Sequence, residues 1–158
     1  MIKYEFTVFA DYFQFELIDD GVDFPADQWN DQTIVDRVAV SQGVITIVTA
    51  RDTSVPVVVE VHELPKDQDA DIEATKQWDH IVECAIEIAS GRLVILGNEY
   101  YPDAPRIIVS PGIYQTRVYY GGLSTLSDDG REGDDIYKIV LWPGKYHEPK
   151  VIKRYSPN

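Results

Sequence analysis

Apolar and polar residues alternate with a period of two over several short runs of this sequence. Within residues 3–10, for example, the alternation assigns the aromatic Tyr4 and Phe6 to one face and the charged Lys3 and Glu5 to the other. Successive side chains of a β-strand point to opposite faces of its sheet, so this period predicts strands. The alternation therefore restricts the chain mainly to β-structure.

Comparable strand-like runs recur along the chain and are separated by turn residues. Nine of them span residues 3–10, 12–18, 44–51, 55–64, 79–88, 92–96, 106–109, 113–120 and 135–142, and residues 151–155 are a further candidate. The Ala-Ser-Gly turn at 89–91 predicts a hairpin between the runs on either side of it. About nine short strands at this spacing predict an all-β fold, mainly an antiparallel β-sandwich, with one short helix.

The helical pattern lies near residues 30–39. Asn30 or Asp31 can cap its N-terminus. Ile34, Val35 and Val38 are spaced three and four residues apart, which predicts a narrow apolar stripe along a helix.

The composition fits a single domain over residues 1–158. Apolar residues make up 44 % of the chain, so its acidity does not indicate disorder. Cys84 is the only cysteine, which excludes an intrachain disulfide framework and a cysteine-based zinc site. The sequence shows neither a leader pattern nor an apolar span of about 20 residues, so we expect a cytoplasmic protein.

Acidic residues are in large excess. Fourteen Lys and Arg face 27 Asp and Glu, which gives a formal net charge of −13. That charge repels phosphate backbones and anionic lipid surfaces, so direct binding to nucleic acid or to a membrane is disfavoured. The charge instead favours a positively charged partner, and we expect a basic protein.

The densest acidic segment is residues 128–135, which we predict to bind the partner. Its acids lie in and directly after a Gly- and Asp-rich loop, and they are Asp128, Asp129, Glu132, Asp134 and Asp135. Long loops are more often functional than short ones. Two alternatives remain open, a solvated loop without a partner and a Ca²⁺-dependent binding module, although the spacing matches no EF-hand.

Tyr119 and Tyr120 precede this loop and are predicted to add aromatic anchors to it. Tyr is frequent at interface hot spots because it brings a large contact area at a low entropy cost. The strand alternation offers another reading, in which one of the two rings faces the core and the other faces water.

The sequence contains no recognisable catalytic, metal or cofactor motif. His62, His80 and His147 are scattered, and no Ser stands in a nucleophile elbow. Glu83 and Glu87 share a strand face, which a polar outer face explains without catalysis. We therefore expect no enzymatic activity, no cofactor and no metal; an enzyme whose site is assembled from distant residues is the further alternative.

The charge balance reverses from Lys138 onward. Five bases face Glu148 as the only acid, and they are Lys138, Lys145, Lys150, Lys153 and Arg154. This basic tail either pairs with acidic stretches of the same chain or forms a solvated end, and both readings stay open.

A series of short motifs occurs in order between residues 4 and 120. The motifs are Asp-Tyr-Phe-Gln-Phe at 11–15, Trp29, Gly-Val-Ile at 43–45, Ala-Arg at 50–51, Ser-Gly at 90–91 and Pro-Gly-Ile-Tyr at 111–114. This order resembles the competence protein J family, the inhibitors of a bacterial DNA-entry nuclease. The resemblance implies an inhibitor or immunity-like protein of a nuclease, whose basic, phosphate-binding cleft an acidic protein can occupy. The acidic loop and the basic tail match none of these motifs.

Overall fold

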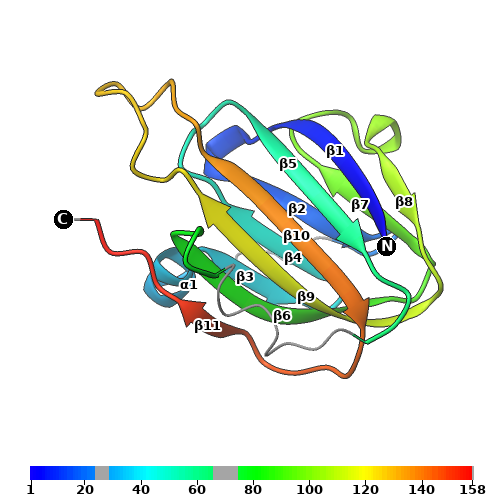
Figure 1. Ribbon diagram of the computed structural model, residues 1–158. Helices are drawn as coiled ribbons and strands as arrows, with labels where there is room; N and C mark the ends of the chain where they lie inside the picture. The colour runs from blue at the N-terminus through cyan, green and yellow to red at the C-terminus, as the bar shows by residue number, and fades with distance from the viewer. Residues whose placement is uncertain (24–28, 66–74, 158) are drawn as a thin grey trace.

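Two β-sheets pack face to face in the computed structural model, which describes residues 1–23, 29–65 and 75–157 (Figure 1). The six-stranded sheet has the order β1 (Ile2–Phe9), β5 (Ser54–Val61), β10 (Ile136–Pro143), β9 (Gly112–Gly121), β6 (His80–Ile88) and β11 (Lys150–Lys153). The five-stranded sheet has the order β3 (Val38–Ser41), β4 (Val44–Val48), β2 (Gln14–Asp19), β7 (Arg92–Leu96) and β8 (Arg106–Ile108). The short α-helix α1 (Asp31–Asp36) accompanies these sheets in the all-β fold that the alternation predicts.

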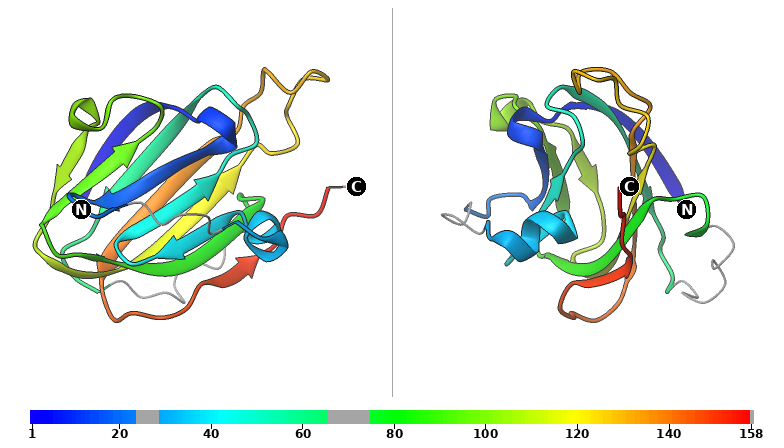
Figure 2. Two further views of the ribbon diagram at one scale, coloured as in Figure 1. Left: turned by 180° about the vertical axis from the view of Figure 1, so that it is seen from behind. Right: turned by 90° about the vertical axis from the view of Figure 1, so that its left-hand side faces the viewer.

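The right-hand view of Figure 2 shows the two sheets end-on, and the main core lies between them. Phe15 and Leu17 of β2 project into it from the five-stranded sheet, and Val57 and Val59 of β5 from the other. These pairs are two residues apart in the sequence, so the period of two marks the inward face of both strands. Burial of this apolar face is the main source of stability in such a sandwich.

The connection at residues 89–91 does not form the predicted hairpin. β6 pairs with β9 on one side and with β11 on the other, so both of its edges are occupied within the six-stranded sheet. β7 belongs to the other sheet, where it pairs with β2 and β8. The turn therefore carries the chain from one sheet to the other, and Gly91 permits this with a positive φ of 71°.

Helix α1 is shorter than the predicted helix over residues 30–39. Asn30 caps it in a capping box with Thr33, and Arg37 ends it in the left-handed conformation. Val38 already belongs to β3, a strand that the sequence pattern missed. The predicted apolar stripe does not form, because Ile34 and Val35 remain more than half exposed.

The basic tail packs against the acidic residues of the same chain. Arg154 donates from Nη2 to the carboxylate of Asp36 at 2.7 Å and from Nη1 to the carbonyl oxygen of Val35 at 2.9 Å. Lys138 lies 3.1 Å from the carboxylate of Glu60 on the neighbouring strand. For these bases the intramolecular reading of the tail is correct.

The parallel pairing of β5 with β10 is the exception to antiparallel pairing among the described strands.

Membrane-spanning helices are not found in the described part of the chain, where no helix has the length and apolarity to cross a bilayer.

Candidate functional site

The acidic loop connects β9 to β10 and projects from one end of the sandwich (Figure 1). Asp128, Asp129, Glu132 and Asp134 are exposed on it. At its base Gly122 adopts a φ of 67°, and a Cβ at this position would collide with the carbonyl oxygen of Asp134. The loop therefore leaves the sheet through a narrow neck that requires glycine.

Hydrogen bonds within the loop fold it into an ordered turn. The Ser127 N–H donates to the Glu132 carbonyl oxygen at 2.7 Å, and the Ser127 hydroxyl donates to the Asp129 carboxylate at 2.6 Å. The Arg131 N–H donates to the same carboxylate at 3.0 Å. These bonds, led by the one from Ser127, hold the pKa of Asp129 below its ordinary value. Asp129 thus shapes the turn.

Three acids of the loop keep carboxylates that point to solvent. Among the described residues, no hydrogen bond or ion pair engages the side chains of Asp128, Glu132 or Asp134. A partner with Lys or Arg side chains can pair with these carboxylates without breaking an existing contact. The three residues are the part of the predicted contact set that the geometry makes most available.

Asp135 has a different role from the one predicted, because it is completely buried. Arg51 donates from Nε to its carboxylate at 2.5 Å, and the Tyr137 hydroxyl donates to its other oxygen at 2.6 Å. The Tyr137 hydroxyl in turn accepts the Ala50 N–H at 2.7 Å. Asp135 therefore anchors the base of the loop to the β4–β5 connection and presents no surface to a partner.

Tyr119 and Tyr120 are both buried, so neither is an exposed anchor beside the loop. The Tyr120 ring packs in the main core, and its hydroxyl donates to the Arg37 carbonyl oxygen at 2.5 Å. The Tyr119 ring lies on the outer face of the six-stranded sheet, where Trp78 covers it at a centroid distance of 5.4 Å. The alternation places the two rings on opposite faces, but both faces are covered here.

Tyr12 and Phe13, which were predicted to begin a strand, form an exposed turn instead. Tyr12 is 81 % exposed and Phe13 is 47 % exposed, in the short 3₁₀ segment Asp11–Phe13 before β2. Both have positive φ angles, 57° and 62°, which are costly for bulky side chains. Two adjacent aromatic residues in an alternating run place one ring on the polar face of the strand. This feature of the sequence could have indicated an exposed aromatic residue here.

Tyr12 and Phe13 border an apolar groove of about 510 Å³. Its lining includes Gln14 and Val48 from the paired strands β2 and β4, together with Trp29 and Ile34. None of the lining residues that the structure describes is Lys, Arg, Asp or Glu. We call this feature the Tyr12 groove.

The acidic loop and the Tyr12 groove are linked through the β4–β5 connection. Asp52 in this connection accepts the Tyr12 N–H at 2.8 Å. The adjacent Arg51 binds Asp135 and also contacts the Arg131 carbonyl oxygen at 3.5 Å. The Asp11–Phe13 segment and the loop between β9 and β10 lie at the same end of the sandwich (Figure 1).

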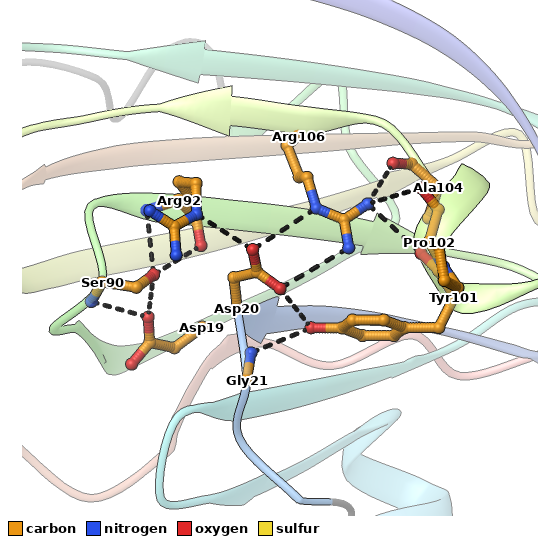
Figure 3. Close-up of polar contacts among 9 residues, drawn as sticks. All are labelled: Asp19, Asp20, Gly21, Ser90, Arg92, Tyr101, Pro102, Ala104 and Arg106. Atoms are coloured by element: carbon orange, nitrogen blue, oxygen red, sulfur yellow. Dashed lines mark hydrogen bonds and ion pairs between the residues drawn. The ribbon is translucent and has the colours of Figure 1, made fainter.

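A polar cluster at β2, β7 and β8 looks like a second candidate site (Figure 3). Asp20 accepts hydrogen bonds from Arg92 Nε at 2.9 Å and from the Tyr101 hydroxyl at 2.8 Å, and Arg106 adds weaker ones. These donors, led by Arg92, lower the pKa of Asp20 to about 2. Arg106 also donates to backbone carbonyl oxygens of residues 101, 102 and 104. Each charged group is used within the cluster, which ties strands together.

Neighbouring Asp19 caps the turn that follows β6. Its carboxylate accepts the Ala89 and Ser90 N–H groups at 3.1 and 3.0 Å and the Ser90 hydroxyl at 2.5 Å. A Ser–carboxylate contact without a histidine lacks the base that a nucleophilic serine needs. The contact explains the sharp crossover between sheets.

Glu83 and Glu87, which share a strand face, do not act together. Glu83 is buried and accepts hydrogen bonds from Arg117 at 3.0 Å from Nε and 2.6 Å from Nη2, while Glu87 is exposed. His147 lies 3.6 Å from Glu83 and 2.5 Å from Gln115. A search of residues 1–23, 29–65 and 75–157 finds no group of three His, Cys, Asp or Glu placed to hold a metal ion.

No protein-family model and no curated protein sequence matches the chain. Two solved structures share its fold. One is the crystal structure of ComJ, inhibitor of the DNA degrading activity of NucA, from Bacillus subtilis, with a TM-score of 0.63 and 16 % identity over 91 % of this chain and 96 % of that chain. The other is described as crocagin biosynthetic gene J, with a TM-score of 0.51 and 15 % identity over 92 % of this chain and 100 % of that chain. At these identities the similarity establishes the fold, and in that respect the predicted resemblance to the competence protein J family is confirmed.

Proposed function

We propose that this protein is an inhibitor-type binding protein that engages a basic protein partner, such as a nuclease, through its acidic loop. The observation that carries the proposal is a set of exposed carboxylates, those of Asp128, Glu132 and Asp134, which have no partner in the part of the chain that the structure describes. They stand on a loop anchored by the buried Arg51–Asp135 pair. A fixed loop that bears like charges binds a basic surface without a large cost of ordering.

The fold similarity to ComJ supports the choice of a nuclease as the partner class. The net charge of −13 supports electrostatic attraction to a basic cleft. Complementary charges accelerate the encounter and make binding weaken as salt increases.

The test measures inhibition of the DNA-degrading activity of purified NucA-type nucleases at low and high salt. The loop variant Asp128→Asn/Glu132→Gln/Asp134→Asn is compared with Glu87→Gln/Asp103→Asn/Glu148→Gln, whose acids are exposed and lie outside the loop. Each variant changes the net charge from −13 to −10, since three acids are neutralised. We expect the loop variant to lose at least about tenfold in affinity and the control to stay near wild type.

Equal losses in both variants would mean that only the overall charge matters. Inhibition of none of the nucleases tested, at any salt concentration, would contradict the nuclease assignment.

A further inference from the structure

The Tyr12 groove is joined to the acidic loop through the contacts of Asp52 and Arg51, and it has the composition of an interface centre. Among the described lining residues, the polar groups of the side chains are those of Gln14, the Tyr12 hydroxyl and the Trp29 indole N–H, and the rings of Tyr12 and Phe13 are exposed. Interfaces concentrate their binding energy in central aromatic pockets surrounded by polar or charged residues. The acidic loop alone supplies only the charged part of such an arrangement.

Three exposed acidic residues lie next to residues of the groove, in the sequence or by contact. Asp11 precedes the aromatic turn, Asp52 binds the Tyr12 N–H, and Asp31 lies one helical turn before Ile34; all three are exposed. Arg51, next to Asp52, connects this segment to the base of the acidic loop through its ion pair with Asp135. An apolar groove with these exposed carboxylates near it is complementary to an apolar side chain flanked by Lys or Arg.

We propose that the Tyr12 groove accepts one apolar side chain of the basic partner protein, whose neighbouring Lys or Arg residues face Asp11, Asp31, Asp52 and the acidic loop. This inference rests on the proposed function and supplies the part of the interface that determines affinity. A second copy of this chain is a poor occupant, because two molecules of charge −13 repel each other.

A substitution at Tyr12, whose backbone has a positive φ, can distinguish a role in binding from a role in folding. Positive φ angles are strained for ordinary L-residues, whereas Asn tolerates them. Tyr12 is 81 % exposed, so its ring contributes little to folding. Tyr12→Asn should therefore maintain or increase thermal stability and at the same time weaken partner binding at least about tenfold. A residue with only a structural role would not produce these opposite effects.

The first experiment titrates the intact protein with two short lysine-rich peptides at physiological ionic strength, one with a central phenylalanine and one with serine in its place. Amide chemical shifts should move at Tyr12, Phe13 and Ile34 with the phenylalanine peptide only. That peptide should bind at least about tenfold more tightly, the effect of burying one aromatic side chain. Equal affinities, or shifts confined to residues 122–134, would overturn the inference.

The second experiment separates this inference from the proposed function. The nuclease-inhibition assay compares the loop variant, Tyr12→Asn and Ile34→Ser, and sedimentation measures the oligomeric state of each. Loss of inhibition in the loop variant alone would retain the proposed function and remove the groove from it. Selective binding of the phenylalanine peptide with no nuclease inhibited would retain the groove and remove the nuclease. A dimer that Tyr12→Asn dissociates would identify a second copy as the occupant and overturn the proposal.

Discussion

Arg51 donates from Nε to the buried carboxylate of Asp135 at 2.5 Å, and this pair connects two segments that are 84 residues apart in the sequence. Asp135 ends the acidic loop, and Arg51 lies next to Asp52, which holds the Tyr12 N–H. One ion pair therefore fixes the position of the acidic loop relative to the aromatic turn.

Asp135→Asn should destabilise the fold strongly. The substitution leaves the Arg51 guanidinium, whose side chain is only 11 % exposed, without its counter-charge. Removing one partner of a buried pair costs about 3–5 kcal/mol, and urea unfolding measures that loss in the free energy of unfolding.

Asp128→Asn is the matched control, because the same chemical change occurs on an exposed loop residue. It should change the free energy of unfolding by no more than about 0.5 kcal/mol. A similar small change for Asp135→Asn would show that other contacts hold the base of the loop.

Asp20→Asn should weaken the connection between β2, β7 and β8. The pKa of Asp20 in the folded protein, about 2, lies below its ordinary value of 3.8, so the carboxylate stabilises the fold at pH values above the ordinary pKa. That stabilisation is lost as the pH falls through about 2. We expect a loss on the order of 1–2 kcal/mol at neutral pH, because solvent screens this partly exposed group.

Acid titration of unfolding stability measures this effect. The difference between wild type and Asp20→Asn should shrink between about pH 4 and the folded-state pKa. Asp103→Asn, an exposed acid in the neighbouring 3₁₀ segment, should follow the wild-type curve. If the difference in unfolding free energy between wild type and Asp20→Asn is the same at all pH values, the loss of stability comes from packing and not from the charge of Asp20.

The strands were predictable because alternation reflects a property of each strand by itself. The 79–88 run became β6 and the 113–120 run became β9, almost at the predicted bounds. The hairpin at 89–91 was wrong because pairing depends on which strand edges are free, and residues distant in the sequence occupy both edges of β6. β3 was missed because it follows the helix after one residue, without a turn signal.

The position of the acidic loop was also predictable, whereas the burial of its flanking residues was not. Asp135 is buried because Arg51 reaches it, and Tyr119 because Trp78 covers the outer face of its sheet. Such contacts depend on tertiary packing and leave no local pattern. The left-handed backbone of Tyr12 and Phe13 was missed for a related reason, since that conformation is rare for aromatic residues.

Glu16→Gln should make the protein more stable at alkaline pH. Glu16 is buried on β2, and burial raises its pKa from 4.5 to about 7, opposed by the hydrogen bond from Gln14 at 3.0 Å. A raised pKa in the folded state means that its contribution to stability is fully present below the unfolded value of 4.5. That contribution is lost as the pH rises through about 7. The gain from the neutral amide should be on the order of 2–3 kcal/mol above this pH, measured by urea unfolding.

Glu99→Gln provides the companion measurement for Glu16. Repulsion by the Glu99 carboxylate is a secondary cause of the raised pKa of Glu16. Its neutralisation should therefore lower that pKa and shift the loss of stability to lower pH. An unchanged midpoint would mean that Glu99 does not contribute to the raised pKa of Glu16.

His80 should make the docking of the C-terminal tail sensitive to acid. Its ring is buried, and Nδ1 accepts the Tyr155 N–H at 3.0 Å, so the ring proton must be on Nε2, which donates to the Asp36 carbonyl oxygen at 2.8 Å. Burial lowers the pKa of His80 below 6.5, and the nearby Arg37 and Arg154 charges add to this. Protonation would place a second N–H against the Tyr155 N–H.

The unfolded chain binds this proton at about pH 6.5 and the folded chain only at lower pH, so stability is complete above that pH and decreases below it. The Tyr155 amide should exchange faster with solvent as the ring protonates. The side chain of the His80→Gln variant does not titrate, so the unfolding stability and the Tyr155 amide exchange should both depend less on pH. Because Glu16 has the opposite pH dependence in an overlapping range, both measurements are made in the Glu16→Gln background. Parallel curves for the two proteins there would exclude His80 as the sensitive group.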